Sequence, residues 1–341
     1  MSDIELRELD PMDPAVTSGL IELLQATHSH DMPELPPPFG PRIRLRLVTP
    51  NPIVTFYRTV ALKDGVVVGY VELTRENDNN SHLMWNDLEV HPDYRRQGIG
   101  SQLLDQAEKQ ARDIGVRTLM AEVAYDFVPA PERFSPGKAF AEAAGFTVGQ
   151  ATFHGIKDLR FNESDELKQV YESAVAASED YEVISWTDSV PGELIDGYCY
   201  LKGRMVTDSP SGELDIEKEE FTPELIRAAE KSMAERGNIK VGTVARHKKT
   251  GALAGLTELV VLLGAEYDSF IGDTIVAPDH RGHRLGVRLK VANEEQLLQR
   301  RPSMRFIHTW NADTNEHMLA VNRDLGYRDY CTDTDYQKKL S

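Results

Sequence analysis

The stretch Val90-His91-Pro92-Asp93-Tyr94-Arg95-Arg96-Gln97-Gly98-Ile99-Gly100 is the most informative part of this sequence. It follows residues 84–90, whose apolar pattern is typical of a strand. It precedes a helix with apolar residues along one stripe, which Gly115 ends. In a loop between a strand and a helix, the loop N–H groups and the free N–H groups of the first helical turn point toward one place. Together with the helix dipole they favour an anion there.

The side chains of this loop support the same interpretation. Gly98 and Gly100 let the backbone approach an anion closely because they have no Cβ, and Arg95 and Arg96 add positive charge suited to phosphate. The glycine spacing and the flanking elements differ from those of a dinucleotide-binding turn, and no Gly-Lys-Ser/Thr follows as in a P-loop. Taken alone, such a turn can also be only a tight connection.

A second copy of the stretch begins 186 residues later, as Val276-Ala277-Pro278-Asp279-His280-Arg281-Gly282-His283-Arg284-Leu285-Gly286. Flanking positions match at the same offset, among them Glu72 with Glu258 and Asp87 with Asp273. A period this long is not that of a solenoid repeat, which is about 20–50 residues. We therefore expect two domains of similar fold. Their expected boundaries are 1–160 for the first domain, 161–180 for a linker and 181–341 for the second domain.

Each copy has the same order of expected elements. In the first copy, strands are expected at 54–62, 66–73 and 84–90, with a Lys-Asp-Gly turn between the first two. The loop and its helix follow, then a buried strand at 118–123 and a short helix that ends before Gly145. This layout predicts an α/β fold with a mainly antiparallel sheet.

The composition excludes several classes of protein. The 341 residues include 38 Lys and Arg and 55 Asp and Glu, a net charge of −17 that would repel nucleic acid and anionic membranes. No apolar run reaches the roughly 20 residues that span a bilayer, and the first residues lack a signal-peptide pattern, so we expect a cytoplasmic protein. Cys199 and Cys331 are too few for a disulfide framework or a zinc cluster. Because the histidines show no metal-ligand spacing either, we predict no metal.

The V-x-P-x-x-R-x-x-G-x-G string, its place after a strand and the downstream Gly145-Phe146 together resemble the GNAT acetyltransferase superfamily. The resemblance covers the core of both halves. It implies two tandem GNAT-like domains of the α/β (α+β) class, each a mixed, mainly antiparallel sheet flanked by helices. In that family the loop binds the pyrophosphate of acetyl-coenzyme A (acetyl-CoA), and the pantetheine arm lies along the preceding strand where the sheet splays. Two-domain members include mycothiol synthase, which the chain resembles in architecture.

The resemblance also implies which residues bind acetyl-CoA. The second half departs from the family pattern at Arg284, which stands in the place of Gly98. It keeps Asn315 of the family's closing segment, where an Asn contacts the cofactor, whereas the first half has Phe134 at that place. We favour cofactor binding in the first half and leave it open for the second. The expected contacts are Val90, Arg95, Arg96, Gln97, Gly98, Ile99, Gly100 and Ser101, and in the second half Val276, Arg281, Gly282, His283, Arg284, Leu285, Gly286 and Asn315.

Three carboxylates are candidates for a catalytic base. The family reaction is the direct attack of an amine on the thioester, which needs a base to take the ammonium proton. Asp87 and Glu89 alternate onto one face of their strand, and Glu122 is the third candidate. Asp87 recurs as Asp273, whereas Glu89 becomes Ile275, so Glu89 is the preferred base for an active first half. Each carboxylate can also be a solvated strand residue.

The acid for the leaving thiolate is less clearly marked. The family's frequent general-acid Tyr is Ala141 in the first half and Asn322 in the second. Tyr125 is the candidate acid, with Tyr94 as an alternative, although an exposed loop tyrosine is the simpler explanation of either residue. The resemblance implies that the backbone N–H near Val90 stabilises the oxyanion.

We therefore expect an acetyl-CoA-dependent N-acetyltransferase that acts on the primary amine of a small molecule, as a monomer or homodimer. The acceptor pocket is expected from the variable residues 18–41 and 192–221. A competing hypothesis is an acyl-CoA-binding scaffold or sensor in which one or both halves are inactive.

Overall fold

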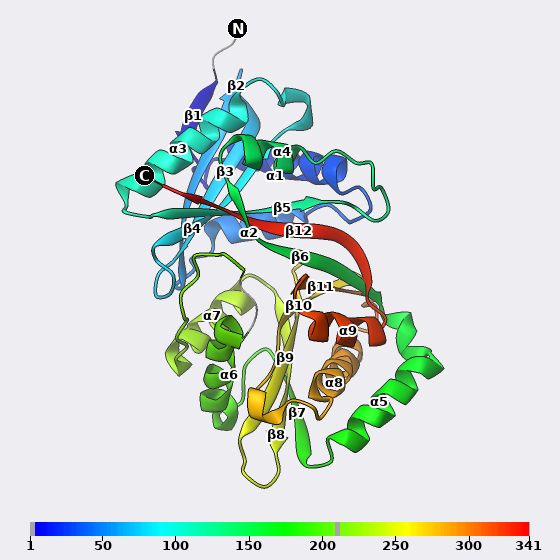
Figure 1. Cartoon of the computed structure of the whole chain (residues 1–341). Helices are drawn as coiled ribbons and strands as arrows, with labels where there is room; N and C mark the ends of the chain where they lie inside the picture. Colours follow the sequence, from blue (N-terminus) through cyan, green and yellow to red (C-terminus); the bar gives the residue numbers. More distant parts are fainter. Residues whose placement is uncertain (1–3, 209–211, 341) are drawn as a thin grey trace.

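The computed structural model describes residues 4–208 and 212–340. Within these ranges, one sheet has the strand order β1-β2-β3-β4-β5-β12-β6-β11-β10-β9-β8-β7 (Figure 1). Neighbouring strands are antiparallel except in the pairs β4–β5 and β10–β11, which confirms the predicted mixed, mainly antiparallel sheet. The strands are β1 Glu5–Glu8, β2 Val54–Lys63, β3 Val66–Glu76, β4 Leu83–Val90, β5 Thr118–Tyr125, β6 Thr147–Asp158, β7 Tyr181–Thr187, β8 Ile239–His247, β9 Leu253–Val261, β10 Asp268–Val276, β11 Phe306–Ala312 and β12 Arg328–Lys339. The α-helices are α1 Pro14–Asp31, α2 Gly40–Val48, α3 Ile99–Asp113, α4 Pro136–Ala143, α5 Asp165–Ala177, α6 Ile195–Asp208, α7 Pro223–Glu235, α8 Leu285–Arg300 and α9 Glu316–Asp324.

Short-range sequence patterns explain many of these elements. The apolar stripe that starts at Ile99 forms the buried side of α3. The turn between β2 and β3 has Asp64 and Gly65 at φ of 52° and 82°, the left-handed conformations that a tight hairpin turn requires. Ser135 and Asn315 cap α4 and α9 by accepting N–H groups of the first turn. Each of these features depends on residues close together in the chain.

Helices cover both faces of the sheet because strand side chains alternate in direction. Val60 and Tyr70 pack against α1 and α2, whereas their neighbours Ala61 and Val71 pack with α3. We call the first surface the α1 face. The second half repeats the arrangement, with α6 and α7 on one face and α8, backed by α5, on the other.

The last strand of each half lies next to the other half. β12, at the end of the chain, pairs with β5 along Thr332–Lys339, and β6 pairs with β11 along Thr152–Asp158. The two exchanged strands also pair with each other at the centre of the sheet. They cross the middle of the molecule in Figure 1. The two halves therefore share one sheet, a feature that the repeat did not predict, and the boundaries at 160 and 181 stay a prediction.

In each half, the two parallel strands pair over only a short distance. β4 pairs with β5 from Leu83 to Trp85, although β4 continues to Val90. β10 pairs with β11 from Asp268 to Phe270, although β10 continues to Val276. The strands thus diverge toward the loops before α3 and α8, and the sheet splays as the resemblance implies.

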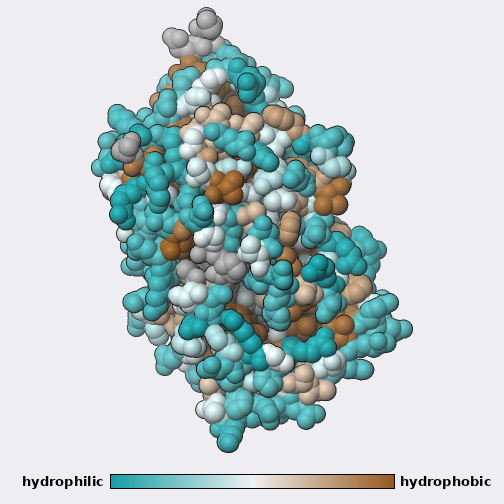
Figure 2. All heavy atoms as spheres, viewed as in Figure 1, coloured by the Kyte–Doolittle hydropathy of each residue, from teal (hydrophilic) through white to brown (hydrophobic). Residues whose placement is uncertain are grey.

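The surface in Figure 2 is mostly hydrophilic, with hydrophobic residues in small separate groups. Among the described residues, no helix combines the length and apolar composition that a membrane crossing requires.

Candidate active site

The first predicted phosphate loop joins β4 to α3. Arg96 and Gly98 have φ of 63° and 82°, and Gly98 is the N-cap of α3 without a side-chain cap. Arg96, Gln97 and Gly98 are exposed. No capping side chain therefore accepts the N–H groups of the first helical turn, and these groups are open to solvent. This arrangement is suited to an anion.

Arg95 holds this loop in place with its side chain. Its Nε donates to the carbonyl oxygen of Val90 at 3.0 Å, and its Nη1 and Nη2 donate to the Asp31 carboxylate at 2.9 and 2.6 Å. Both edges of the Arg95 guanidinium are therefore engaged, whereas Arg96 is exposed, so a direct phosphate contact is a prediction for Arg96 rather than for Arg95. Ile99 is a core residue, so only its backbone faces the loop.

The second loop has the same backbone with glycine and arginine interchanged. Gly282 and Arg284 have φ of 85° and 53°, at the positions of Arg96 and Gly98. Each loop thus places one glycine and one arginine in the left-handed region, where a non-glycine residue costs roughly 1–2 kcal/mol. This explains how Arg284 replaces the family's glycine without a change of loop shape. Arg281 again donates to the carbonyl oxygen of Val276, at 3.3 Å.

Helix α5 covers part of the second loop. Arg284 Nη1 donates to Ser173 Oγ at 2.7 Å, and His283 Nδ1 lies 3.3 Å from the carbonyl oxygen of Ala177. Among the described residues, no helix has the corresponding contacts with the first loop, where Gln97 instead accepts a hydrogen bond from Lys63. The two loops therefore share a backbone but differ in what surrounds them.

The candidate bases lie together on the α1 face of the first half. Cross-strand pairing places Asp87 beside Glu72, and Glu122 beside Asp335 of the exchanged strand β12. Glu72 is neutralised by Arg46 and Arg58. Among the described residues, Asp87, Glu89, Glu122 and Asp335 have no cationic partner within ion-pair distance.

The protein surroundings raise the pKa of these unpaired carboxylates. Burial, with the nearby Asp31, raises the pKa of Glu89 to about 7, although a hydrogen bond from Thr27 opposes the shift. Limited hydration and the charge of Asp333 raise the pKa of Glu122 to about 8. Limited hydration also raises the pKa of Asp87. A carboxyl group that titrates near neutral pH is suited to accept a proton from an amine.

The second half has no such group of unpaired carboxylates among its described residues. Lys202 forms an ion pair with Asp273, the counterpart of Asp87. Lys240 pairs with Glu258 at 2.9 Å, and Ile275 replaces Glu89 in the apolar core. The chemistry of the α1 face is therefore not repeated in the second half.

Tyr125 lies apart from the carboxylates. It is three residues after Glu122 on one strand, so its side chain points to the opposite face of the sheet. Its hydroxyl hydrogen-bonds to Thr334 Oγ1 at 2.9 Å, and Lys138 lies over its ring. Tyr94 lies in the first loop, edge-on to His91. The structure thus brings the candidate bases together but not the candidate acid.

Asn315 caps α9 through a hydrogen bond from the N–H of Met318 at 3.2 Å. The equivalent cap of α4 is Ser135, not the exposed Phe134. The sequence comparison was wrong by one residue because it aligned the helices at their C-terminal glycines, and α4 is one residue shorter than α9.

Other residues at the site were not predicted. Thr27 and the last residue of α1, Asp31, lie inside the variable region 18–41, and Asp333 and Asp335 lie on β12. Asp31 has its counterpart in Asp208 at an offset of 177 rather than 186, so the repeat did not reveal it. Of the expected pocket region 192–221, residues 209–211 lie outside the described ranges.

Comparisons with known proteins bear on the family and the fold of the chain. Residues 19–146 match the family model described as Acetyltransferase (GNAT) family. The chain is similar to a tandem GNAT protein from the clavulanic acid biosynthesis pathway, with 28% identity, a TM-score of 0.82 and coverage of 99% of both chains. A GCN5-related N-acetyltransferase from Sphaerobacter thermophilus shares the fold at 14% identity, with a TM-score of 0.67 and coverage of 99% of this chain and 96% of that one. A search of the curated proteins found no match.

The family match and the shared tandem fold support an acyltransferase with acetyl-CoA as its cosubstrate. Residues 19–146 match a GNAT domain, and the whole chain has the fold of the tandem GNAT protein. None of the comparisons indicates a metal for it.

Proposed function

We propose that the first half transfers the acetyl group of acetyl-CoA to the primary amine of a small molecule. The observation that carries this proposal is the group of unpaired carboxylates, Asp87, Glu89 and Glu122, beside the point where β4 and β5 diverge. The second half, with its ion-paired Asp273, offers no equivalent set.

In this reaction the exposed backbone donors of the first loop bind the pyrophosphate. The pantetheine arm runs between the diverging strands and brings the thioester to the α1 face. Glu89, directly or through a water molecule, takes the proton of the ammonium group, and the free amine attacks the thioester carbon. The N–H near Val90 stabilises the oxyanion. The tetrahedral intermediate collapses, the C–S bond breaks and the thiolate of coenzyme A leaves, to be protonated by water, because Tyr125 lies on the opposite face of the sheet.

The acceptor is expected to carry positive charge. Glu122 and Asp335 lie side by side, and Asp87 lies on the same face of the sheet, beside Glu72. The like charges of these carboxylates raise one another's pKa. An ammonium group that enters this region would relieve this repulsion and be attracted by the carboxylates. This favours a small cationic amine over an anionic acceptor.

The second half supports a different role. Its loop keeps the anion-binding backbone, including Arg281 and Gly286, but its carboxylates are neutralised and α5 contacts the loop. We propose that this half binds acyl-CoA without turnover, which is the scaffold or sensor hypothesis applied to one half only. We expect the chain to work in the cytoplasm as a monomer or homodimer.

A panel of primary amines with acetyl-CoA, followed by release of the free thiol, tests the proposal. We expect turnover with cationic amines and its loss in Glu89→Gln. Tight binding of acetyl-CoA without turnover on any amine would contradict the enzyme hypothesis and favour the scaffold.

A further inference from the structure

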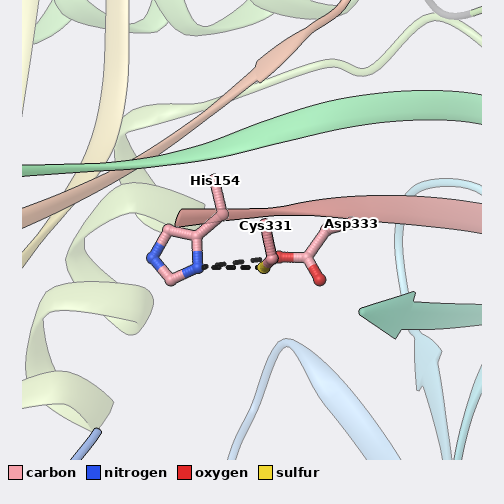
Figure 3. A group of neighbouring side chains, drawn as sticks. All are labelled: His154, Cys331 and Asp333. Carbon is pink, nitrogen blue, oxygen red and sulfur yellow. Dashed lines mark hydrogen bonds and ion pairs between the residues drawn. The ribbon is translucent and has the colours of Figure 1, made fainter. Parts of the chain in front are cut away.

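Three side chains with different donor atoms converge where the exchanged strands pair. His154 lies on β6, and Cys331 and Asp333 lie on β12 (Figure 3). All three are at least 94% buried. His154 Nδ1 lies 3.7 Å from Cys331 Sγ and 3.9 Å from Asp333 Oδ2, and one ligand atom from each residue lies within 4.8 Å of the others. A nitrogen, a sulfur and an oxygen thus face one small volume.

A chain of hydrogen bonds determines which nitrogen of His154 carries the proton. The Asp268 carboxylate only accepts, so His308 Nε2, 3.0 Å away, is its donor. The other nitrogen of a neutral His308 is then an acceptor, and His154 Nε2 donates to it at 2.9 Å. His154 Nδ1 is therefore left with a lone pair that points toward Cys331 and Asp333. A lone pair in this position is what a metal ion requires of an imidazole.

The other members are also held in place before any ligand arrives. The indole N–H of Trp310 donates to Asp333 Oδ2, and the Trp310 ring stacks on the His154 ring with centroids 4.3 Å apart. Hydrogen bonds from outside the ligand set orient ligands in protein metal sites. In this chain the orienting groups come from β10 and β11, so four strands contribute to the cluster.

We propose that His154, Cys331 and Asp333 bind a zinc ion that ties β6 of the first half to β12 of the second. Zinc accepts nitrogen, sulfur and oxygen ligands in a tetrahedron, and its bond lengths place nitrogen and sulfur about 3.6 Å apart. The observed 3.7 Å between Nδ1 and Sγ needs almost no adjustment. Magnesium and calcium prefer oxygen ligands alone. Binding displaces the thiol proton of Cys331 to solvent, and water fills the fourth position.

Cobalt(II) is the probe for this site because a cobalt–thiolate bond has its own near-ultraviolet absorption band. The full chain is treated with a chelator and titrated with Co²⁺. We expect one equivalent to bind with a thiolate band. Cys331→Ser should lose the band, and Cys199→Ser should keep it, because Cys199 is the other buried cysteine and packs in an apolar cluster.

A second variant keeps all three ligands. Asp268→Asn replaces an obligate acceptor by an amide that can accept or donate, so the direction of the hydrogen-bond chain through His308 is no longer fixed. We expect Co²⁺ binding about 10–100-fold weaker, the usual cost of losing an orienting partner, with circular dichroism unchanged. The absence of a thiolate band in the wild type, its persistence in Cys331→Ser, or an unchanged affinity in Asp268→Asn would each overturn the proposal.

Discussion

Asp31, the last residue of α1, holds Arg95 of the first loop by two hydrogen bonds of 2.9 and 2.6 Å. Asp208, the last residue of α6, lies 3.4 Å from Arg281 of the second loop. In both halves, a helix that covers one face of the sheet is therefore tied to the predicted phosphate loop. In the proposed active site, the Asp31–Arg95 ion pair would join the acceptor side to the cofactor side.

Asp31→Asn should weaken acetyl-CoA binding. It removes the charge from a bidentate pair, which is among the stronger hydrogen-bonded contacts in proteins. We expect about tenfold weaker binding, or roughly 1.4 kcal/mol, measured by isothermal titration calorimetry. Asp208→Asn is the matched control. An Asp31→Asn variant that binds acetyl-CoA as tightly as the wild type would show that the pair does not position the loop.

Glu89→Gln should remove the acidic limb of the pH profile, in which activity rises with pH. Because burial raises the pKa of Glu89 to about 7, the carboxylate that accepts the proton forms as pH rises through 7. We expect kcat/KM to increase over this range in the wild type. The variant should be slower by about 10²–10⁴-fold and should lack this limb. If Glu122→Gln loses it instead, Glu122 is the base.

Gly100→Trp and Gly286→Trp should separate the two halves. The two glycines are equivalent, and neither has a positive φ. A Cβ at Gly100 would lie 3.4 Å from Phe140, and one at Gly286 3.9 Å from Val321, so a Cβ atom fits at both positions at ordinary contact distance. An indole at Gly100 should displace the cofactor and lower kcat/KM by about 100-fold or more. Loss of activity only in Gly286→Trp would place the reaction in the second half.

Glu122→Gln should stabilise the protein at pH 8 more than at pH 5. Glu122 has a folded-state pKa near 8, well above the value of about 4.3 in an unfolded chain. The folded state therefore holds a proton that the unfolded state has lost, and this carboxyl destabilises the fold increasingly as pH rises from about 4.3 to 8. Thermal unfolding at both pH values measures the difference. An equal change in Tm at both would show that the pKa is not raised.

Residues 1–160 alone should not form a stable folded monomer. Without β12, the backbone edge of β5 has no partner, and the core next to α3 lacks the buried Tyr336. Open strand edges favour aggregation. Co-expression with residues 161–341 should restore a single folded species by size-exclusion chromatography and circular dichroism. A well-folded monomer of 1–160 would contradict this expectation.

The local sequence pattern was sufficient to predict the two loops, the hairpin turn and the apolar stripe of α3. Arg95, Gly98 and Gly100 follow one strand and open one helix, so their shared role depends on a few neighbouring residues. That Asp87 and Glu89 share one face of the sheet follows from the alternation of side chains along one strand. The correspondence of the two halves was also visible, because it is a property of the sequence itself.

Strand partners and side-chain clusters were not visible in the sequence. Asp333 and Asp335 lie next to the strand that pairs with β12. The residues of β12 do not by themselves determine that this partner is β5 of the first half. His154 and Cys331 are 177 residues apart, so no spacing rule unites them. Short segments determine their own conformation through local sterics and capping, whereas neighbours across a sheet are selected by the packing of the whole chain. The predicted phosphate loop could therefore be recognised from the sequence. The acidic face and the central His–Cys–Asp cluster could be recognised only from the tertiary structure.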